Sequence, residues 1–251
     1  MSDLKKSNAF DYLKAFTDAR IFIGKKGSSI PTNELLKFEW AHARAKDAVY
    51  TVLLKEQLIT SLKNELQLDY LELHSCANNR KEYLKKPDFG RRLNSDSIKK
   101  LKHQKQKGYT LAIIIADGLS ANAVNIHAIP FLKLFLSLIK TSGWEIAPIC
   151  IVNQARVAIG DQIGVLLKAN ITVMCIGERP GLSSPDSMGI YFTYHPCLGL
   201  TDELRNCISN IRARGMSYEM AAAKLYYLLQ KALQLRLSGV QLKDDFKTSL
   251  K

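Results

Sequence analysis

Residues 171–215 read ITVMCIGERPGLSSPDSMGIYFTYHPCLGLTDELRNCISNIRARG, and this is the most informative stretch of the chain. Its first six residues, Ile171–Ile176, are mostly apolar and often β-branched, and they lie between Asn170 and Gly177. Such a short apolar run is typical of a strand that is covered on both faces of a sheet. Glu178 and three further charged or turn-forming residues follow at its carboxyl end. In open α/β sheets ligands bind outside that end, so the stretch predicts a strand followed by a binding loop.

The surrounding sequence alternates apolar runs with helical patterns. From Tyr109 onward this alternation predicts βαβ units and a parallel sheet. The expected strands are Leu111–Ala116, Ile146–Val152, Ile171–Ile176 and Gly189–Tyr194. The expected helices are about Pro130–Lys140, one that ends at Val165–Ala169, Asp202–Ile211 and Tyr218–Leu237. The fold class is therefore α/β, a parallel sheet with flanking helices.

The amino-terminal part of the chain is mainly helical in its pattern. Helices are expected at Asp11–Arg20, from about Thr32 to Leu53, and at Ser95–Lys107. The sequence GKKGSS at residues 24–29 predicts a turn, and the alternating YLELH at residues 70–74 predicts a strand. Gly108 ends the lysine-rich helix and marks the expected boundary between two domains, residues 1–108 and residues 109–251.

The composition is that of a globular protein. Hydrophobic residues make up 47% and charged residues 24% of the 251, and no uninterrupted apolar run approaches the ~18 residues of a membrane span. The amino terminus lacks the apolar core of a signal peptide. The five cysteines show no CxxC spacing, so neither a disulfide framework nor a metal site is indicated. We therefore expect a cytoplasmic protein with no membrane association.

Most of the positive charge lies in one segment, which we call the basic block, Arg80–Lys107. Its eleven Lys or Arg oppose three acidic residues, so it carries +8 of the net +13. A solvated helical face and a surface for an acidic protein partner are both consistent with this block. Nucleic acid is disfavoured, because only Tyr83 and Phe89 could stack on bases and no nucleic-acid-binding motif occurs elsewhere.

Three polar residues, Asp117, Asn153 and Glu178, follow the carboxyl ends of expected strands. Because right-handed crossovers bring these ends to one edge of a sheet, we expect a crevice there. Arg156 and Arg179 could add cations to it. The first strand is not followed by GxGxxG or a phosphate-loop lysine, so ordinary dinucleotide or triphosphate binding is disfavoured. The crevice therefore predicts a binding site of another kind.

Cys207 has two interpretations. It follows Asn206 near the start of the expected helix Asp202–Ile211, where a thiolate would be favoured. A nucleophile paired with His195 is conceivable, but a structural or ligand-lining thiol is the favoured interpretation. The sequence contains no evident nucleophile beside a base, and we assign no catalytic residue.

Four long passages resemble one known family. Residues 171–215 contain IGERPGLSSPDSMGIYFTYHP and TDELRNCISNIRARG, and three earlier passages agree with them in order. These are RIFIGKKGSSIPTNELLKFEWAHARAKDAV at 20–49, ADGLSANAV at 116–124 and ARVAIGDQIG at 155–164. Together they resemble the small, or light, subunit of ethanolamine ammonia-lyase, an adenosylcobalamin-dependent bacterial enzyme.

The resemblance implies a fold, a reaction and a partner. Residues 109–251 would be a Rossmann-like cobalamin-binding domain that completes the cofactor site. The large subunit, an (α/β)8 barrel, would hold ethanolamine and carry out the radical deamination to acetaldehyde and ammonia. This chain would be inactive without it.

The resemblance also implies cofactor-binding residues. They are Val157 in ARVAIGD, Glu178 in GERPG and Cys207 in RNCISN. Val157 would offer backbone groups and an apolar surface, Glu178 an acceptor for amide or hydroxyl donors, and Cys207 a packing contact.

Two other classes of function stay open from the residues alone. A freestanding corrinoid- or nucleotide-binding module would use the same crevice without a partner, and a basic nucleic-acid-binding protein would use the charge. Family members that enter a bacterial microcompartment often carry an amino-terminal extension, whereas here the family pattern begins near residue 11. The bacterial cytoplasm is therefore the expected location, with the microcompartment lumen as the alternative.

Overall fold

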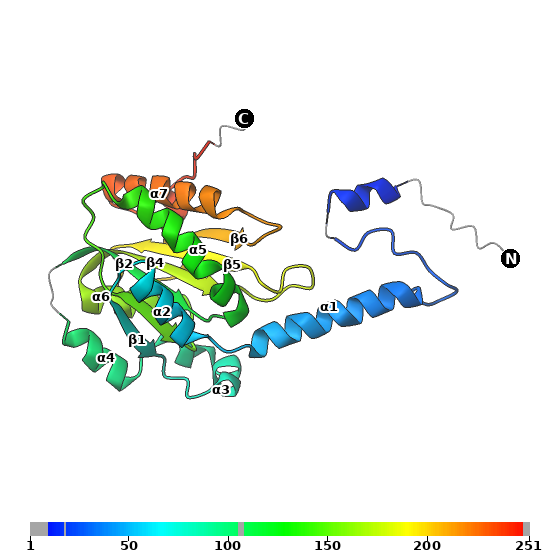
Figure 1. Ribbon diagram of the computed structural model, residues 1–251, viewed down its shortest axis with the longest axis horizontal. Helices are drawn as coiled ribbons and strands as arrows, with labels where there is room; N and C mark the ends of the chain where they lie inside the picture. Colours follow the sequence, from blue (N-terminus) through cyan, green and yellow to red (C-terminus); the bar gives the residue numbers. More distant parts are fainter. Residues whose placement is uncertain (1–9, 18, 105–107, 248–251) are drawn as a thin grey trace.

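The computed structural model describes residues 10–17, 19–104 and 108–247, which form a six-stranded sheet with flanking helices (Figure 1). The strands are β1 (Tyr70–His74), β2 (Tyr109–Ala116), β3 (Ile149–Asn153), β4 (Ala169–Gly177), β5 (Met188–Tyr194) and β6 (Asn206–Ile211). The helices are α1 (Thr32–Tyr50), α2 (Lys55–Asn64), α3 (Arg80–Lys85), α4 (Ser95–Lys102), α5 (Ala121–Ile139), α6 (Ile159–Leu167) and α7 (Tyr218–Leu235). Short 3-10 helices lie at Asp11–Ala15, Pro87–Arg91, Asp202–Leu204 and Gly239–Gln241. The predicted α/β class is confirmed.

The sheet is mixed and its strand order is β1-β3-β2-β4-β5-β6. Strands β1 to β4 run parallel, as the sequence predicted. Strands β5 and β6 are antiparallel to their neighbours, so the expectation of a wholly parallel sheet is wrong there. A parallel return needs a crossover of about a dozen or more residues, usually a helix. Residues 178–187 join β4 to β5 without a helix, and the chain therefore turns back on itself.

The predicted helix Asp202–Ile211 is wrong. Only Asp202–Leu204 is helical, as a 3-10 turn, and Asn206–Ile211 forms the edge strand β6. Ile208 and Ile211 are buried beneath α7, and Ile208 lies opposite Ile190 in β5. Pairing with the free edge of β5 provides hydrogen-bond partners for the backbone N–H and C=O groups of this segment. This tertiary contact overrides the local helical pattern.

The amino-terminal expectations are mostly confirmed. The GKKGSS segment is a turn closed by mutual backbone hydrogen bonds between Lys26 and Ser29, and the long helix is α1. The first expected helix is a 3-10 turn over Asp11–Ala15, and residue 18 lies outside the described residues. The lysine-rich helix is α4, and residues 105–107 of its expected range also lie outside them.

The expected division of the chain at Gly108 stays a prediction. Strand β1, which precedes it in sequence, pairs with β3 and so belongs to the same sheet as the strands that follow. Helix α2 likewise buries Leu58 and Leu62 in the core beside α5. The sheet and its core thus draw on both sides of Gly108.

The core has one layer on each face of the sheet. On one face Ile113 and Ile115 pack with α5 and α7, and on the other Ile114 packs with α6 and α4. Complete burial of such side chains contributes about 1.5–3 kcal/mol each to folding.

Helix α5 is long and apolar enough to cross a membrane by length and composition. Nine of its residues, including Phe131, are buried in the protein, and this packing accounts for its apolar character.

The loops after β2 and β4 approach each other closely. The Leu119 N–H donates to the Gly177 carbonyl over 2.9 Å. A Cβ atom at Gly177 would overlap the backbone carbonyl of Ser120, and Gly118 has a φ of +58°. The Ser120 hydroxyl also donates to the Pro185 carbonyl over 2.9 Å. Only glycine therefore fits at Gly118 and Gly177. The two loops hold each other in a fixed position at the carboxyl ends of β2 and β4.

Helix α1 projects away from the sheet, so that much of its surface is not covered by the rest of the chain (Figure 1). Only Ala41 and Ala48 among its residues are buried. Its connection to α2 is fixed by Asn125 of α5, which accepts from the Leu54 N–H over 2.9 Å and donates to the Val52 carbonyl over 3.0 Å. The direction in which α1 leaves the body is thus set by hydrogen bonds.

Candidate functional site

A cleft lies where the direction of chain winding changes. Strand β2 has β3 on one side and β4 on the other, and the connecting helices α5 and α6 cover opposite faces of the sheet. This arrangement creates a crevice beyond the carboxyl ends of β2 and β4, where ligands bind in open α/β sheets. The cleft has a volume of about 450 Å³ and is lined by Tyr83, Gly118, Leu119, Arg156, Val157, Ile176, Gly177, Glu178, Arg179, Tyr191 and Ser209. We call it the switch-point cleft.

Two of the three cofactor-binding residues that the family resemblance implied line this cleft. Val157 comes from the loop after β3, and Glu178 follows β4 directly. Cys207 lies on β6, opposite Tyr191 of β5, and Tyr191 is part of the lining. The structure therefore brings Val157 and Glu178 to one cavity and places Cys207 next to it.

Glu178 is held in place by several contacts. Its Oε2 atom accepts a hydrogen bond from the Ser187 hydroxyl and a longer one, 3.3 Å, from the Asn210 N–H. Its Oε1 atom lies against Gly189, where a Cβ atom would come within 2.8 Å. The half-buried carboxylate thus has a defined position between β5 and β6 and can also present an acceptor to the cleft.

Cys207 is exposed on an edge strand, and the predicted position near a helix start is wrong. Desolvation by neighbouring atoms raises the pKa of its thiol, as does the negative charge of Glu178, and these outweigh a hydrogen bond with Tyr191 that lowers that pKa. The expected thiolate is therefore not favoured. His195 follows β5 near the amino end of β4, at the opposite edge of the sheet from Glu178. The arrangement does not support a Cys207–His195 nucleophile.

Asp117 holds the loops after β2 and β3 together beneath the cleft. Its carboxylate accepts hydrogen bonds from the backbone N–H groups of Gln154 at 2.8 Å and Ala155 at 3.0 Å. Burial raises the pKa of this carboxyl group, whereas these two donors and the Arg80 guanidinium at 3.7 Å act to lower it. Asp117 was expected at this edge of the sheet, and the structure places it there as a structural anchor.

Two residues that shape the cleft, Arg80 and Tyr83, were not expected there from the sequence. Arg80 donates to the Val49 carbonyl at 2.7 Å and to the Gly118 carbonyl at 2.8 Å, although it is the first residue of the basic block. The Tyr83 hydroxyl donates to the Ala155 carbonyl at 2.9 Å, and burial raises the pKa of this phenol. Nothing in their sequence spacing distinguishes them from the solvated residues around them.

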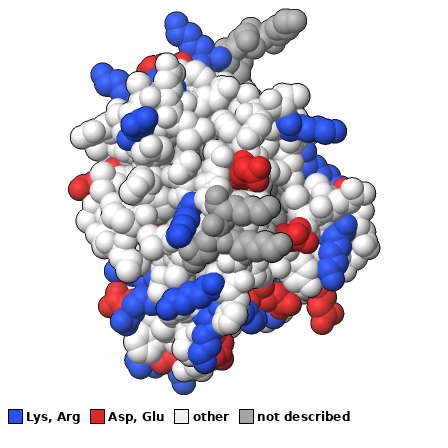
Figure 2. Space-filling view, turned by 90° about the vertical axis from the view of Figure 1, so that its left-hand side faces the viewer, with Lys and Arg blue, Asp and Glu red and all other residues white. Residues whose placement is uncertain are grey.

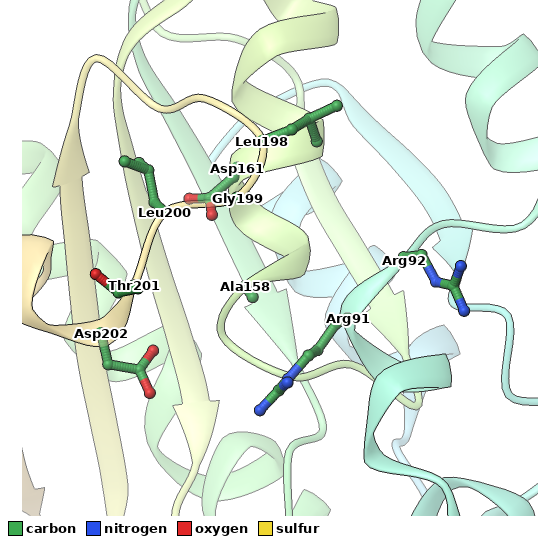
Figure 3. Close-up of a pocket in the computed structure, with 9 residues that line it drawn as sticks. All are labelled: Arg91, Arg92, Ala158, Asp161, Leu198, Gly199, Leu200, Thr201 and Asp202. Carbon is green, nitrogen blue, oxygen red and sulfur yellow. The ribbon is translucent and has the colours of Figure 1, made fainter.

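A second hollow of about 610 Å³ lies beside α6 (Figure 3). It is lined by Arg91, Arg92, Ala158, Asp161, Leu198, Gly199, Leu200, Thr201 and Asp202. In Figure 3 the loop that carries Leu198 to Asp202 passes over the start of α6, and Arg92 points away from that loop. Asp161 is engaged by the buried Arg205, with paired contacts of 2.6 and 2.7 Å. Its carboxylate is neutralised there, so the charges that this hollow presents come from Arg91, Arg92 and Asp202.

The basic block is partly neutralised by its own acids. Glu82 pairs with Lys86, Asp88 with Arg91 and Asp96 with Lys99, all within one helical turn. Figure 2 shows Lys and Arg side chains gathered over the lower part of the face that carries α4, with a few acidic side chains among them. Such exposed pairs contribute roughly 0–1 kcal/mol each to stability. The remaining lysines leave this face positive.

Within the part of the chain that the structure describes, no group of three or more His, Cys, Asp or Glu residues could hold a metal ion. The switch-point cleft instead offers Arg156 and Arg179 as donors, Glu178 as an acceptor, and apolar surface from Val157 and Tyr191. This mixture suits an organic ligand that carries amide or hydroxyl groups and at most a small negative charge.

Comparison with known proteins gives a consistent result. The family model for the ethanolamine ammonia-lyase light chain matches residues 7–243. The chain is 52% identical over 236 residues to the ethanolamine ammonia-lyase small subunit of Pseudomonas putida (strain GB-1), covering 93% of this chain and 86% of the relative. It is 50% identical over 241 residues to the protein of the same name in Azotobacter vinelandii (strain DJ / ATCC BAA-1303), covering 95% and 89%.

Proposed function

Because the chain belongs to the ethanolamine ammonia-lyase light-chain family, we propose that it completes the adenosylcobalamin site of a two-subunit lyase. The lyase would convert ethanolamine to acetaldehyde and ammonia. The observation that carries this proposal is the switch-point cleft, in which Val157 and Glu178 come together from two separate loops. Cofactors bind at such a place in many α/β proteins.

The residues of the cleft fit a corrinoid. Glu178 would accept from amide or hydroxyl donors at the periphery of the cofactor, Val157 would supply an apolar contact, and Cys207 would pack at the side. A ligand that large would cover the cleft and extend beyond its 450 Å³, as expected of a site shared with a second protein. When bound, the cofactor supplies a radical by cleavage of its cobalt–carbon bond, and this chain supplies binding and orientation.

The partner that we propose is the large subunit, which the name of the relatives implies. Helix α1 exposes large apolar side chains, among them Leu36 at 58% and Trp40 at 64% exposed. Contiguous exposed apolar surface commonly marks a protein interface. In this proposal the large subunit covers α1, holds ethanolamine and supplies the catalytic groups, so that this chain alone is inactive. We place the complex in the bacterial cytoplasm, with the microcompartment lumen as the alternative.

Replacement of Glu178 tests the proposed cofactor site. A hydrogen bond to a charged group contributes about 1.5–3 kcal/mol, so Glu178→Ala should weaken cobalamin binding by roughly 10- to 150-fold. Glu178→Gln should weaken it less, because one acceptor oxygen remains. The measurement is a spectroscopic titration of cyanocobalamin into the assembled two-subunit complex.

Two controls make this titration decisive. Glu203→Ala removes an exposed carboxylate outside the cleft and should leave the affinity unchanged. With saturating adenosylcobalamin, turnover of both Glu178 variants should recover most of the wild-type value, since Glu178 takes no part in the chemical step. An assembled Glu178→Ala complex that binds cyanocobalamin as tightly as wild type would show that the site has been misassigned.

A further inference from the structure

Arg156 is a cation of the switch-point cleft without a paired carboxylate among the described residues. Its side chain lines the cleft, and its Nε atom is buried without a hydrogen-bond partner. The acidic side chains in and beneath this cleft are engaged elsewhere, Glu178 by Ser187 and Asn210, and Asp117 mainly by backbone N–H groups. A buried donor that lacks a partner is unfavourable, so this guanidinium has hydrogen-bonding capacity to spare.

The guanidinium is nevertheless held in a fixed place. Its carbon lies 4.4 Å from the centre of the Tyr83 ring, and the Tyr83 hydroxyl is tied to the Ala155 carbonyl. The backbone N–H of Arg156 donates to the Gly90 carbonyl over 2.8 Å. A Cβ atom at Gly90 would come within 2.9 Å of the Arg156 Cγ atom, so Gly90 also packs against the side-chain stem. Backbone, side-chain stem and planar group are therefore each positioned, and little freedom is lost when a ligand binds.

The charge of the cleft indicates what Arg156 would bind. Arg156 and Arg179 oppose the single carboxylate of Glu178 in the lining, while Arg80 and Asp117 beneath it offset each other. The planar fork of arginine suits oxygen acceptors in particular. The lining thus offers an acceptor at Glu178 and donors at Arg156 and Arg179.

We infer that Arg156 is a further ligand-binding residue, which donates hydrogen bonds to an acceptor oxygen of the bound molecule. The acceptor is an amide carbonyl or a phosphate oxygen, and the guanidinium would donate hydrogen bonds to either in the same way. This inference rests on the proposed function for the identity of the ligand. It assigns to Arg156 the donor role that complements the acceptor role of Glu178.

The test uses three variants of the assembled two-subunit complex. Arg156→Met keeps a similar apolar stem over Tyr83 but removes the donors, and Arg156→Lys keeps the charge but not the planar fork. Arg236→Met makes the same chemical change at an exposed position outside the cleft. We expect Arg156→Met to weaken cyanocobalamin binding by about 10- to 150-fold, Arg156→Lys to weaken it less, and Arg236→Met to have no effect.

Titration with dicyanocobinamide distinguishes the two acceptors. This probe retains the peripheral amides but lacks the phosphate and the nucleotide. If Arg156→Met weakens binding of both probes, the acceptor is an amide carbonyl, and if it weakens only cyanocobalamin binding, the acceptor is the phosphate. Thermal unfolding of each variant is measured alongside, and the Lys variant decides the matter if the Met variant does not fold.

The outcomes also separate this inference from the proposed function. If both Arg156 variants bind both probes as tightly as wild type, while Glu178→Ala weakens binding, only the role of Arg156 is overturned. A wild-type complex that fails to bind cyanocobalamin overturns the role of Arg156 and the proposed function together.

Discussion

Arg205→Ala is expected to lower the free energy of unfolding of this chain by about 3–5 kcal/mol, because it leaves the buried carboxylate of Asp161 without its partner. Arg205 is 7% exposed, and its two terminal nitrogens contact the two oxygens of Asp161 at 2.6 and 2.7 Å. It also donates to Thr193 and to the Leu200 carbonyl. One side chain thus ties α6, β5 and the loop after β5 together. Urea unfolding followed by circular dichroism measures the loss.

Two further variants test this explanation. Asp202 contacts the same guanidinium at 3.3 Å, but its side chain is 91% exposed. Asp202→Ala should therefore cost no more than about 1 kcal/mol. The double variant Arg205→Met with Asp161→Leu replaces the buried pair by apolar groups and should recover much of the stability that Arg205→Ala loses. A loss below about 1 kcal/mol for Arg205→Ala would mean that solvent reaches Asp161 and that the pair does not hold the loop.

Leu36→Glu combined with Trp40→Glu should abolish assembly with the large subunit. The two residues are one helical turn apart in α1, at 58% and 64% exposed. Helix α1 is the helix that leaves the body in Figure 1. Truncation of a central aromatic anchor costs a typical interface about 2 kcal/mol or more, and two buried carboxylates without partners add to that loss. Co-purification of the two subunits, followed by size-exclusion chromatography, measures assembly.

A matched control makes the same change of charge elsewhere. Leu235 and Val240 are 51% and 77% exposed near the carboxyl end of α7, away from α1 in Figure 1. Leu235→Glu with Val240→Glu should leave assembly intact, and neither double variant should alter the thermal unfolding of the isolated chain by more than a few degrees. If the α1 variant assembles normally, α1 is not the surface that the large subunit covers.

The parallel half of the sheet could be predicted because its strands are buried on both faces. Residues 111–116 and 171–176 are runs of apolar, mostly β-branched side chains, and burial alone fixes such runs as central strands. The position of Glu178 followed from the same argument, since parallel strands end at one edge. The cleft was thus predictable from strand ends, without knowledge of any contact.

The antiparallel half could not be predicted in the same way. β6 is an edge strand whose Cys207 is exposed, so its burial pattern carries no clear period of two. What makes residues 206–211 a strand is the free edge of β5, which lies outside the segment itself. The prediction of a thiolate at Cys207 was wrong for the same reason, because it depended on a helix that does not form.

Arg156 and Arg179 were expected at the cleft from the sequence, but the residues that support Arg156 were not. Arg80, Tyr83 and Gly90 lie between β1 and β2, away from the strand ends that predicted the cleft, and several lysines surround them in the sequence. Their role becomes visible only when Tyr83 is seen beneath both arginines, with ring contacts of 4.8 Å to Arg80 and 4.4 Å to Arg156.

An assay of the separate and mixed subunits shows whether this chain completes an active site that neither subunit holds alone. Acetaldehyde release from ethanolamine is measured with adenosylcobalamin present, for this chain alone, for the large subunit alone and for the two mixed. We expect turnover only in the mixture, because we place the catalytic groups on the large subunit and part of the cofactor site on this chain. Turnover by this chain alone, or undiminished turnover by the large subunit without it, would show that this chain does not complete the active site.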